Sequence, residues 1–157
     1  MQKTYLKVNQ EPKTLQRALA SLSGSDGPGI YKLYYFENGQ PRKIQRLFGE
    51  DINGLLYVGM TEGTLINRVR DLQKALLSNS EKDMLGPASS GHTQMGKKYY
   101  RIRNKIDVDN LFIEIFPNQN PKQAETNDLE DYVNKFAELP PLNGQYGSYD
   151  PDWSKFC

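Results

Sequence analysis

The sequence predicts an α+β domain in which helices pack on a small antiparallel sheet of about three strands. Three short aromatic or apolar runs bounded by turn residues predict the strands, at residues 29–37, 55–60 and 110–116. Segments with leucines at helical spacing predict helices at residues 12–24, 65–77 and 121–139. The predicted order is helix, β-hairpin, strand, helix, loop, helix, strand and helix, which is typical of the α+β class.

The N-terminal part, residues 1–26, is predicted to be a short helix followed by a loop. Leu15 and Leu19 lie on one face of this helix, and Gly24 offers a stop. After the first strand, Asn38-Gly39 predicts a tight hairpin turn. We expect residues 43–48 to be the returning arm of this hairpin and residues 49–54 to form a second turn.

The second half contains the longer helices. Thr61 or Thr64 could cap the helix that begins near Leu65. Residues 78–95 are polar, contain scattered Gly, Pro and Ser, and are predicted to be a long loop, whereas residues 95–106 are predicted to be helical. The prolines and glycines of 140–147 end the last helix. We therefore expect a main domain over residues 27–144 and a tail, 145–157, that packs on it through Trp153 and Phe156.

Composition excludes several classes of protein. The chain has 157 residues with 20 basic and 19 acidic side chains, a net charge of +1 and a single cysteine, Cys157. One thiol cannot form an intramolecular disulfide, and there is no Cys/His cluster for zinc. Neither a signal peptide nor an apolar run long enough to cross a membrane is visible. These features favour a soluble intracellular protein, in the cytoplasm, with no membrane partner.

Positive charge is concentrated in two places. Residues 97–105 carry five cations in nine residues with two tyrosines between them, and residues 40–46 add three more. A solvated helix face is the ordinary explanation of such a run. Basic residues interleaved with aromatic ones also suit a phosphate backbone, which makes Lys97, Lys98 and Arg101 candidate contacts for nucleic acid.

Five sequence features occur in a familiar order. They are GIY at 29–31, YVG at 57–59, an arginine in the next helix, a glutamate in a later helix, and PPLN at 140–143. In this the chain resembles the GIY-YIG nuclease superfamily, over about three quarters of its length from 27 to 143. The resemblance implies a metal-dependent endonuclease that hydrolyses phosphodiester bonds in DNA with Mg²⁺ or Mn²⁺.

The resemblance also implies roles for the two motifs. Tyr31 would lie beside the attacking water and act as general base, with its pKa lowered by nearby positive charge. Tyr57 would line the same site and order water or phosphate. Gly29 and Gly59 would allow close approach of DNA or of the neighbouring strand. The structural alternative is that both tyrosines are cross-strand packing residues.

The arginine that resembles the family's phosphate ligand is Arg68. It lies three residues after Leu65 and eleven after Tyr57, slightly farther than is usual in the family. Arg70 is rotated about 200° around the helix and is expected in solvent. Many members have a histidine one turn after the arginine, where this chain has Leu72. His92, the only histidine, could supply a comparable function from the predicted loop or contact DNA.

Two glutamates of the last helix are candidates for the metal ligand. Glu125 lies seven residues before Tyr132 and eighteen before Asn143, the spacing of members that end in a similar segment. Glu130 lies thirteen before Asn143, which fits members with a shorter helix end. Leu129 and Tyr132 follow Glu125 at helical spacing, which favours Glu125 as the inward carboxylate. Asn143 would fix the helix end near the site.

An alternative function remains open at this point. The missing helical histidine and the near-neutral charge are also compatible with a DNA-binding protein that has the fold but weak or no catalysis. A single site of this kind cuts one strand at a time, so double-strand cleavage would need a homodimer, a protein partner or two encounters. The predicted hairpin could contact DNA through Arg42, Lys43 and Arg46, or be a surface hairpin without a role in recognition.

Overall fold

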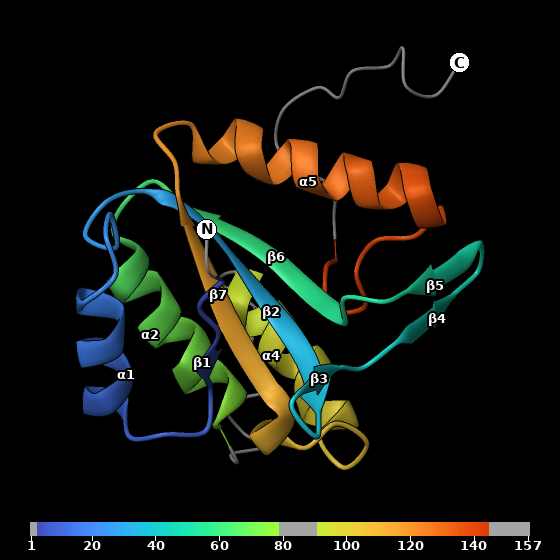
Figure 1. The fold of residues 1–157 in the computed structure, drawn as a ribbon, viewed down its shortest axis with the longest axis horizontal. Helices are drawn as coiled ribbons and strands as arrows, with labels where there is room; N and C mark the ends of the chain where they lie inside the picture. The colour runs from blue at the N-terminus through green and yellow to red at the C-terminus, as the bar shows by residue number, and fades with distance from the viewer. Residues whose placement is uncertain (1–2, 79–90, 145–157) are drawn as a thin grey trace.

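The computed structural model in Figure 1 describes residues 3–78 and 91–144. Its main sheet is antiparallel and has β2 (Gly29–Glu37) at its centre, between β6 (Leu55–Thr61) and β7 (Leu111–Pro117). Two short strands extend it: β1 (Leu6–Lys7) pairs with β7, and β3 (Gln40–Pro41) pairs with the end of β2. The α+β class and the three central strands are confirmed, and the sheet has five strands in all.

The turn after β2 is the predicted tight one. Asn38 and Gly39 have φ angles of 53° and 75° and connect the paired residues Glu37 and Gln40. Two consecutive residues with positive φ suit the right-handed twist of a hairpin, and Asn-Gly is the pair that adopts this conformation most readily.

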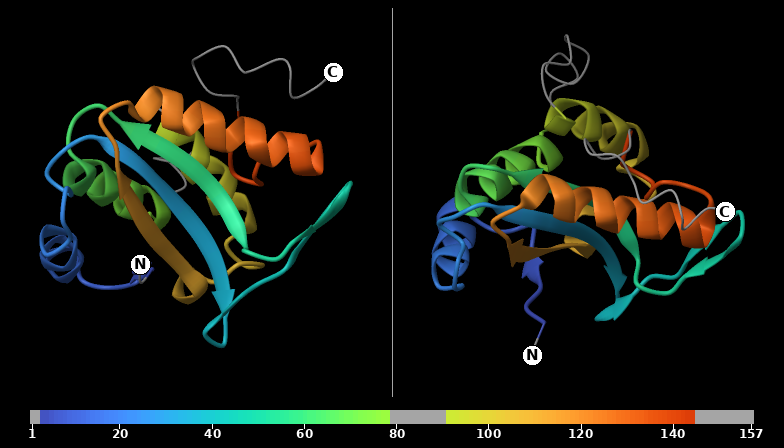
Figure 2. Two further views of the ribbon diagram at one scale, coloured as in Figure 1. Left: turned by 45° about the horizontal axis from the view of Figure 1, so that its top comes forward. Right: turned by 90° about the horizontal axis from the view of Figure 1, so that it is seen from above.

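The predicted returning arm at residues 43–48 is wrong. β3 ends at Pro41, and one further hydrogen bond joins the Arg42 N–H to the Tyr35 carbonyl of β2 at 2.8 Å. The next strand, β4 (Ile44–Arg46), pairs with β5 (Gly49–Asp51) in a separate two-stranded sheet. Figures 1 and 2 show the β4–β5 hairpin projecting beyond the end of that sheet.

The helices within the described residues are α1 (Pro12–Ala20), α2 (Leu65–Leu76), α4 (Gly91–Ile102) and α5 (Pro121–Phe136), and a 3₁₀ turn, η1 (Val108–Asn110), precedes β7. Of the two candidate caps, Thr64 is the N-cap of α2, and its hydroxyl accepts a hydrogen bond from the Asn67 N–H at 3.3 Å. The predicted loop is wrong for residues 91–95, which are helical. Met95 and Tyr99 lie one helical turn apart and are both buried in the core, so packing stabilises α4 there despite its polar sequence.

Helices cover the sheet unequally. In the view of Figure 1, α2 and α4 lie behind the sheet, with α1 beside α2, whereas α5 runs across the β6 edge. The core cluster joins β2 and β7 to α2 and includes Val8, Leu15 and Leu19 from the N-terminal segment. Residues 3–26 therefore pack into the same core as the rest, and the tail at 145–157 lies outside the described residues. No described helix, in 3–78 or 91–144, could span a bilayer.

The free edge of β6 is covered by the PPLN segment. The Leu142 N–H donates to the Leu56 carbonyl at 2.8 Å. The side-chain amide of Asn143 accepts from the Val58 N–H and donates to the Val58 carbonyl, both at 2.9 Å. Asn143 thus satisfies the backbone of β6 as a neighbouring strand would, next to Tyr57.

We expect Asn143→Ala to lower the free energy of unfolding by about 1 to 3 kcal/mol, because two hydrogen bonds to partly buried backbone are lost. Urea denaturation followed by circular dichroism measures this. Asn134→Ala is the matched control, since Asn134 is exposed on α5 and its removal should change stability by less than about 0.5 kcal/mol. Equal effects of the two substitutions would contradict the assigned role of Asn143.

Candidate active site

The pairing of β2 with β6 brings Tyr31 and Tyr57 together. Tyr31 is opposite Gly59, and Tyr57 is opposite Leu33, so the two tyrosines are diagonal neighbours on one face of the sheet. Their ring centroids are 6.2 Å apart with the planes tilted by 40°. Tyr31 is completely buried, and Tyr57 is nearly so.

Gly59 leaves the space in which the Tyr31 ring lies. A Cβ atom on Gly59 would be 2.4 Å from both Cζ and Oη of Tyr31, closer than real side chains approach each other. A Cβ on Gly29 would lie 2.4 Å from the Phe116 carbonyl oxygen of β7. Both glycines therefore permit close approach within the protein, and contact of either with DNA stays a prediction.

Arg68 extends from α2 toward the tyrosines. Its guanidinium takes part in a hydrogen bond with the Tyr31 hydroxyl, which together with its charge acts to lower the pKa of Tyr31. The Nε of Arg68 is buried and has no hydrogen-bond partner among the described residues. Arg70 is exposed, as predicted, and Leu72 is fully buried in the core.

The pKa of Tyr31 does not follow the expectation. Burial raises this pKa well above the usual value, and the neighbouring Tyr57 raises it further. The charge of Arg68 lowers the pKa, but by less than burial raises it. Burial also raises the pKa of Tyr57, followed by the charge of Glu125, against the opposing effect of Arg68. The expected lowering is therefore wrong for the isolated protein: desolvation of a phenolate outweighs one nearby cation, and both phenols are neutral at pH 7.

Glu125 reaches the same cluster from α5. Burial raises the pKa of its carboxyl group to about 7, and the Arg68 charge opposes this shift. Glu130 is more buried, at 8% exposure, but its charge is not among those that shift the pKa of either tyrosine. The structure thus brings Tyr31, Tyr57, Arg68 and Glu125 into electrostatic contact, and of the two glutamates it favours Glu125 for a role in this cluster.

The donor set is compatible with a Mg²⁺-type ion. No group of three or more His, Cys, Asp or Glu side chains within 3–78 and 91–144 could hold a metal. Mg²⁺ commonly takes only one or two carboxylates and completes its shell with waters and phosphate oxygens. Glu125 forms no ion pair with another described residue, so a partly buried carboxylate is available for such an ion.

The basic residues of α4 differ in their surroundings. Lys98 Nζ donates to the Asn143 carbonyl at 3.1 Å, which ties α4 to the segment that covers β6. Lys97 is partly buried and has an interaction partner, whereas Arg101 is exposed. His92 belongs to α4 and not to a loop, and its side chain lies outside what the structure describes.

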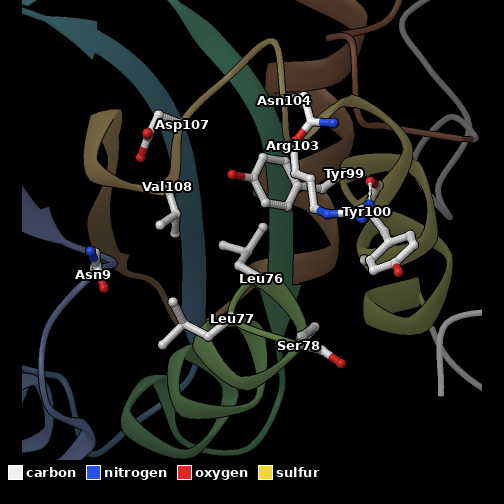
Figure 3. A pocket seen from close by; sticks show the side chains of 12 residues that line it. Asn9, Leu76, Leu77, Ser78, Tyr99, Tyr100, Arg103, Asn104, Asp107 and Val108 are labelled. Carbon is white, nitrogen blue, oxygen red and sulfur yellow. Dashed lines mark hydrogen bonds between the residues drawn. The ribbon is translucent and has the colours of Figure 1, made fainter. Parts of the chain in front are cut away.

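Two cavities in the described part of the chain lie away from this cluster. Figure 3 shows one of about 340 Å³ between the end of α2 and α4, where Leu76 faces Tyr99 and the Arg103 guanidinium lies over the Tyr100 ring at 3.7 Å. The other, of about 360 Å³, lies between α5 and the sheet beside the Lys32–Asp128 ion pair. Neither is lined by Tyr31, Tyr57, Arg68 or Glu125. These two cavities therefore give no evidence for the candidate site.

One anchoring residue was not predicted. Asp51 is buried at the end of β5, where it accepts hydrogen bonds from the Tyr132 hydroxyl at 2.9 Å and from the N–H groups of Asn53 and Leu55. It joins the β4–β5 hairpin to both β6 and α5. An aspartate ahead of Asn-Gly is a signal for a side-chain-stabilised turn, but its long-range partner, Tyr132, has no local sequence signal.

Comparison of the chain with protein-family models, with curated proteins and with solved structures gives no match. Function is therefore inferred from the sequence motifs and from the geometry of the cluster.

We expect Gly59→Ala to destabilise the protein by more than about 2 kcal/mol, because the new methyl group overlaps the Tyr31 ring. Gly63→Ala is the control: Gly63 has no positive φ, and its Cβ would meet only Thr61 Oγ1 at 3.5 Å. Thermal unfolding measures both. Tyr31→Ala in the Gly59→Ala background should recover part of the loss. Additive effects of these two substitutions would contradict the proposed overlap.

Glu125→Gln should stabilise the metal-free protein at pH 8 by about 1 to 3 kcal/mol. The pKa of Glu125 is raised on folding, so below about pH 4.5, where the carboxyl group is protonated in both states, it does not lower the free energy of unfolding. Between pH 4.5 and about 7 the unfolded chain binds fewer protons than the folded protein, and the free energy of unfolding falls as the pH rises. The difference between wild type and variant should therefore disappear near pH 4. Urea unfolding in chelator at both pH values measures it.

Glu62→Gln, at an exposed position, is the control for this substitution and should change stability by less than about 0.5 kcal/mol. Added Mg²⁺ should stabilise the wild type and not Glu125→Gln, since a ligand that binds only the folded state raises its stability. A Glu125→Gln protein that is less stable than the wild type at pH 8 would contradict the raised pKa.

Proposed function

We propose that this chain is a metal-dependent endonuclease of the GIY-YIG type that hydrolyses phosphodiester bonds in DNA. The observation that carries the proposal is the unpartnered, buried Nε of Arg68 beside two tyrosines and a carboxylate. A buried donor without a partner costs free energy. A phosphate oxygen would satisfy this donor, and the planar guanidinium is suited to hold two such oxygens.

Each residue of the cluster has a role in the proposal. Arg68 holds the scissile phosphate and stabilises the charge that develops on it. Tyr31 and Tyr57, as neutral phenols, orient Arg68 and order water and phosphate by hydrogen bonds. Glu125 holds Mg²⁺ or Mn²⁺, which when bound stabilises phosphate charge and lowers the pKa of coordinated water. Deprotonation of Tyr31 as general base would require positive charge in addition to that of Arg68.

The DNA would extend from this cluster toward α4. Arg101 is exposed there for contact with the phosphate backbone, and Lys97 and His92 belong to the same helix. Lys98 would act mainly by supporting Asn143. Because one such cluster cuts a single strand, double-strand cleavage would involve a homodimer or a second encounter.

The second candidate function is DNA binding with weak or no catalysis. Two observations favour it: the raised pKa of Tyr31, which opposes its action as a base, and the burial of Leu72 where many GIY-YIG members have a histidine. A gel shift on duplex DNA without nicking under any metal condition would select this candidate.

Incubation with supercoiled plasmid tests the nuclease. We expect nicking with Mg²⁺ or Mn²⁺ and none with chelator. Arg68→Ala and Glu125→Ala should each lower the rate by about 100-fold or more, the usual effect of removing a charge-stabilising group. Tyr31→Phe should also lower the rate, because it removes the hydroxyl that orients Arg68.

Two variants serve as controls for this assay. Arg70→Ala removes an exposed cation from the same helix as Arg68, and Glu130→Gln neutralises the alternative carboxylate; both should remain active. Full activity of Glu125→Ala with loss in Glu130→Gln would move the metal ligand to Glu130. Metal-independent nicking that survives all three site substitutions would identify a contaminant and refute the proposal.

A further inference from the structure

The tip of the β4–β5 hairpin exposes large apolar side chains. Leu47 and Phe48 at the turn are 72% and 67% exposed, and Ile52, just after β5, is 59% exposed. In Figures 1 and 2 the hairpin stands away from the sheet, beyond the end of α5. Exposed apolar groups gathered at a projecting turn are typical of a contact surface.

The hairpin is held firmly in this position. The side chain of Arg46 is only 12% exposed; its Nη2 donates to the Leu139 carbonyl at 2.7 Å, and its Nε lies 3.2 Å from Glu138 Oε2. The same carboxylate oxygen accepts from the Leu47 N–H at 2.9 Å. A partly desolvated ion pair with further hydrogen bonds orders the turn, so the apolar tip is presented without the entropy of a free loop.

The base of the hairpin is joined to the elements of the candidate site. Asp51 binds the Tyr132 hydroxyl of α5 and the N–H of Leu55 at the start of β6. β6 carries Tyr57, and α5 carries Glu125. These contacts fix the position of the hairpin tip relative to the candidate site.

The size of the tip limits what it can contact. A standard protein–protein interface involves about 20 to 30 residues on each side, and the tip offers two side chains, with Ile52 nearby. Such a small apolar projection is too small for a stable dimer. It does suit insertion between two base pairs, where single Phe, Leu, Ile or Met side chains act as wedges.

Cations adjoin the tip on the hairpin stem. The side chains of Arg42 and Lys43 are 58% and 68% exposed, and each is paired with one surface carboxylate, Glu37 at 3.3 Å and Glu50 at 3.8 Å. Exposed pairs of this kind contribute little stability. DNA phosphates can therefore replace the carboxylates as partners of these two cations.

We propose that Leu47 and Phe48 form a wedge that enters the base stack of the same duplex DNA that the candidate site binds, with Arg42 and Lys43 on the flanking phosphates. This inference rests on the DNA binding in the proposed function but not on catalysis. The wedge would favour flexible pyrimidine–purine steps, which unstack most easily.

Fluorescence of 2-aminopurine tests the wedge, because its emission rises when the base is unstacked. Duplexes carrying it at TA, CA and GC steps are titrated with the full chain in chelator, so that no strand is cut. We expect at least a twofold rise with wild type, largest at TA or CA steps. The Leu47→Ser/Phe48→Ser double variant should lose this rise and bind about tenfold more weakly.

Ile52→Ser is the matched control, since it removes an equally exposed apolar side chain away from the turn. It should keep the fluorescence rise. The circular dichroism and melting temperature of all variants should match the wild type, because the replaced side chains are exposed. An unchanged fluorescence rise in the double variant would overturn the wedge.

The same proteins in the plasmid assay separate the two proposals. Nicking by the wild type without a fluorescence rise overturns the wedge and leaves the nuclease, whereas a rise without nicking supports the wedge and refutes catalysis. Absence of DNA binding refutes both. Self-association of the wild type that the double variant lacks, measured by sedimentation, would identify a second copy of the chain as the occupant and overturn the wedge.

Discussion

The close approach of the Tyr31 ring to Gly59 is the constraint on which the candidate site depends. A Cβ on Gly59 would lie 2.4 Å from the end of the Tyr31 ring, and with glycine there the Tyr31 hydroxyl forms hydrogen bonds with Tyr57 and Arg68. The register that pairs Gly59 with Tyr31 also places Tyr57 diagonally beside Tyr31. The GIY and YVG motifs, 28 residues apart in sequence, are thus linked by the requirement that residue 59 has no side chain where the Tyr31 ring lies. A tyrosine in the first motif needs a glycine in the second.

The cluster contrasts with the buried polar pairs elsewhere in the fold. Tyr34 donates to Glu114, and Tyr132 donates to Asp51, each at 2.9 Å, so these carboxylates have partners within the protein. Arg46 Nε lacks a hydrogen bond but lies 3.2 Å from the Glu138 carboxylate. At the candidate site, Arg68 Nε has no hydrogen-bond partner and belongs to no ion pair among the described residues, and the pKa of Glu125 is raised to about 7. Groups left unsatisfied in this way reduce stability and concentrate at functional sites. This asymmetry favours a ligand at the cluster, one with negative charge near Arg68 and positive charge near Glu125.

The sequence predicts the parts of this fold that depend on local chemistry. Aromatic strands, the Asn-Gly turn and the Thr64-capped helix follow from residue patterns over short distances, and so do the four residues of the cluster through the resemblance. Local sequence patterns do not predict secondary structure that depends on contacts between residues far apart in the sequence. Residues 91–95 are helical because Met95 packs in the core, and β1 exists because β7 has a free edge to pair with. The sign of the Tyr31 pKa shift depends on burial, which charge counting omits.

The helix α5 connects the two surfaces proposed to contact DNA. Glu125 lies near its start, and Tyr132, which holds Asp51 at the base of the hairpin, lies seven residues later. A rise of 1.5 Å per residue places them roughly 10 Å apart along the helix axis, or about three base-pair steps of 3.4 Å. Because the tip lies beyond Asp51, a wedge at Leu47 and Phe48 would act at least about three steps from the bond that is cut. Unstacking at that distance would bend the duplex without disturbing the geometry of the scissile phosphate, so binding preference and cleavage chemistry can be changed separately on one rigid helix.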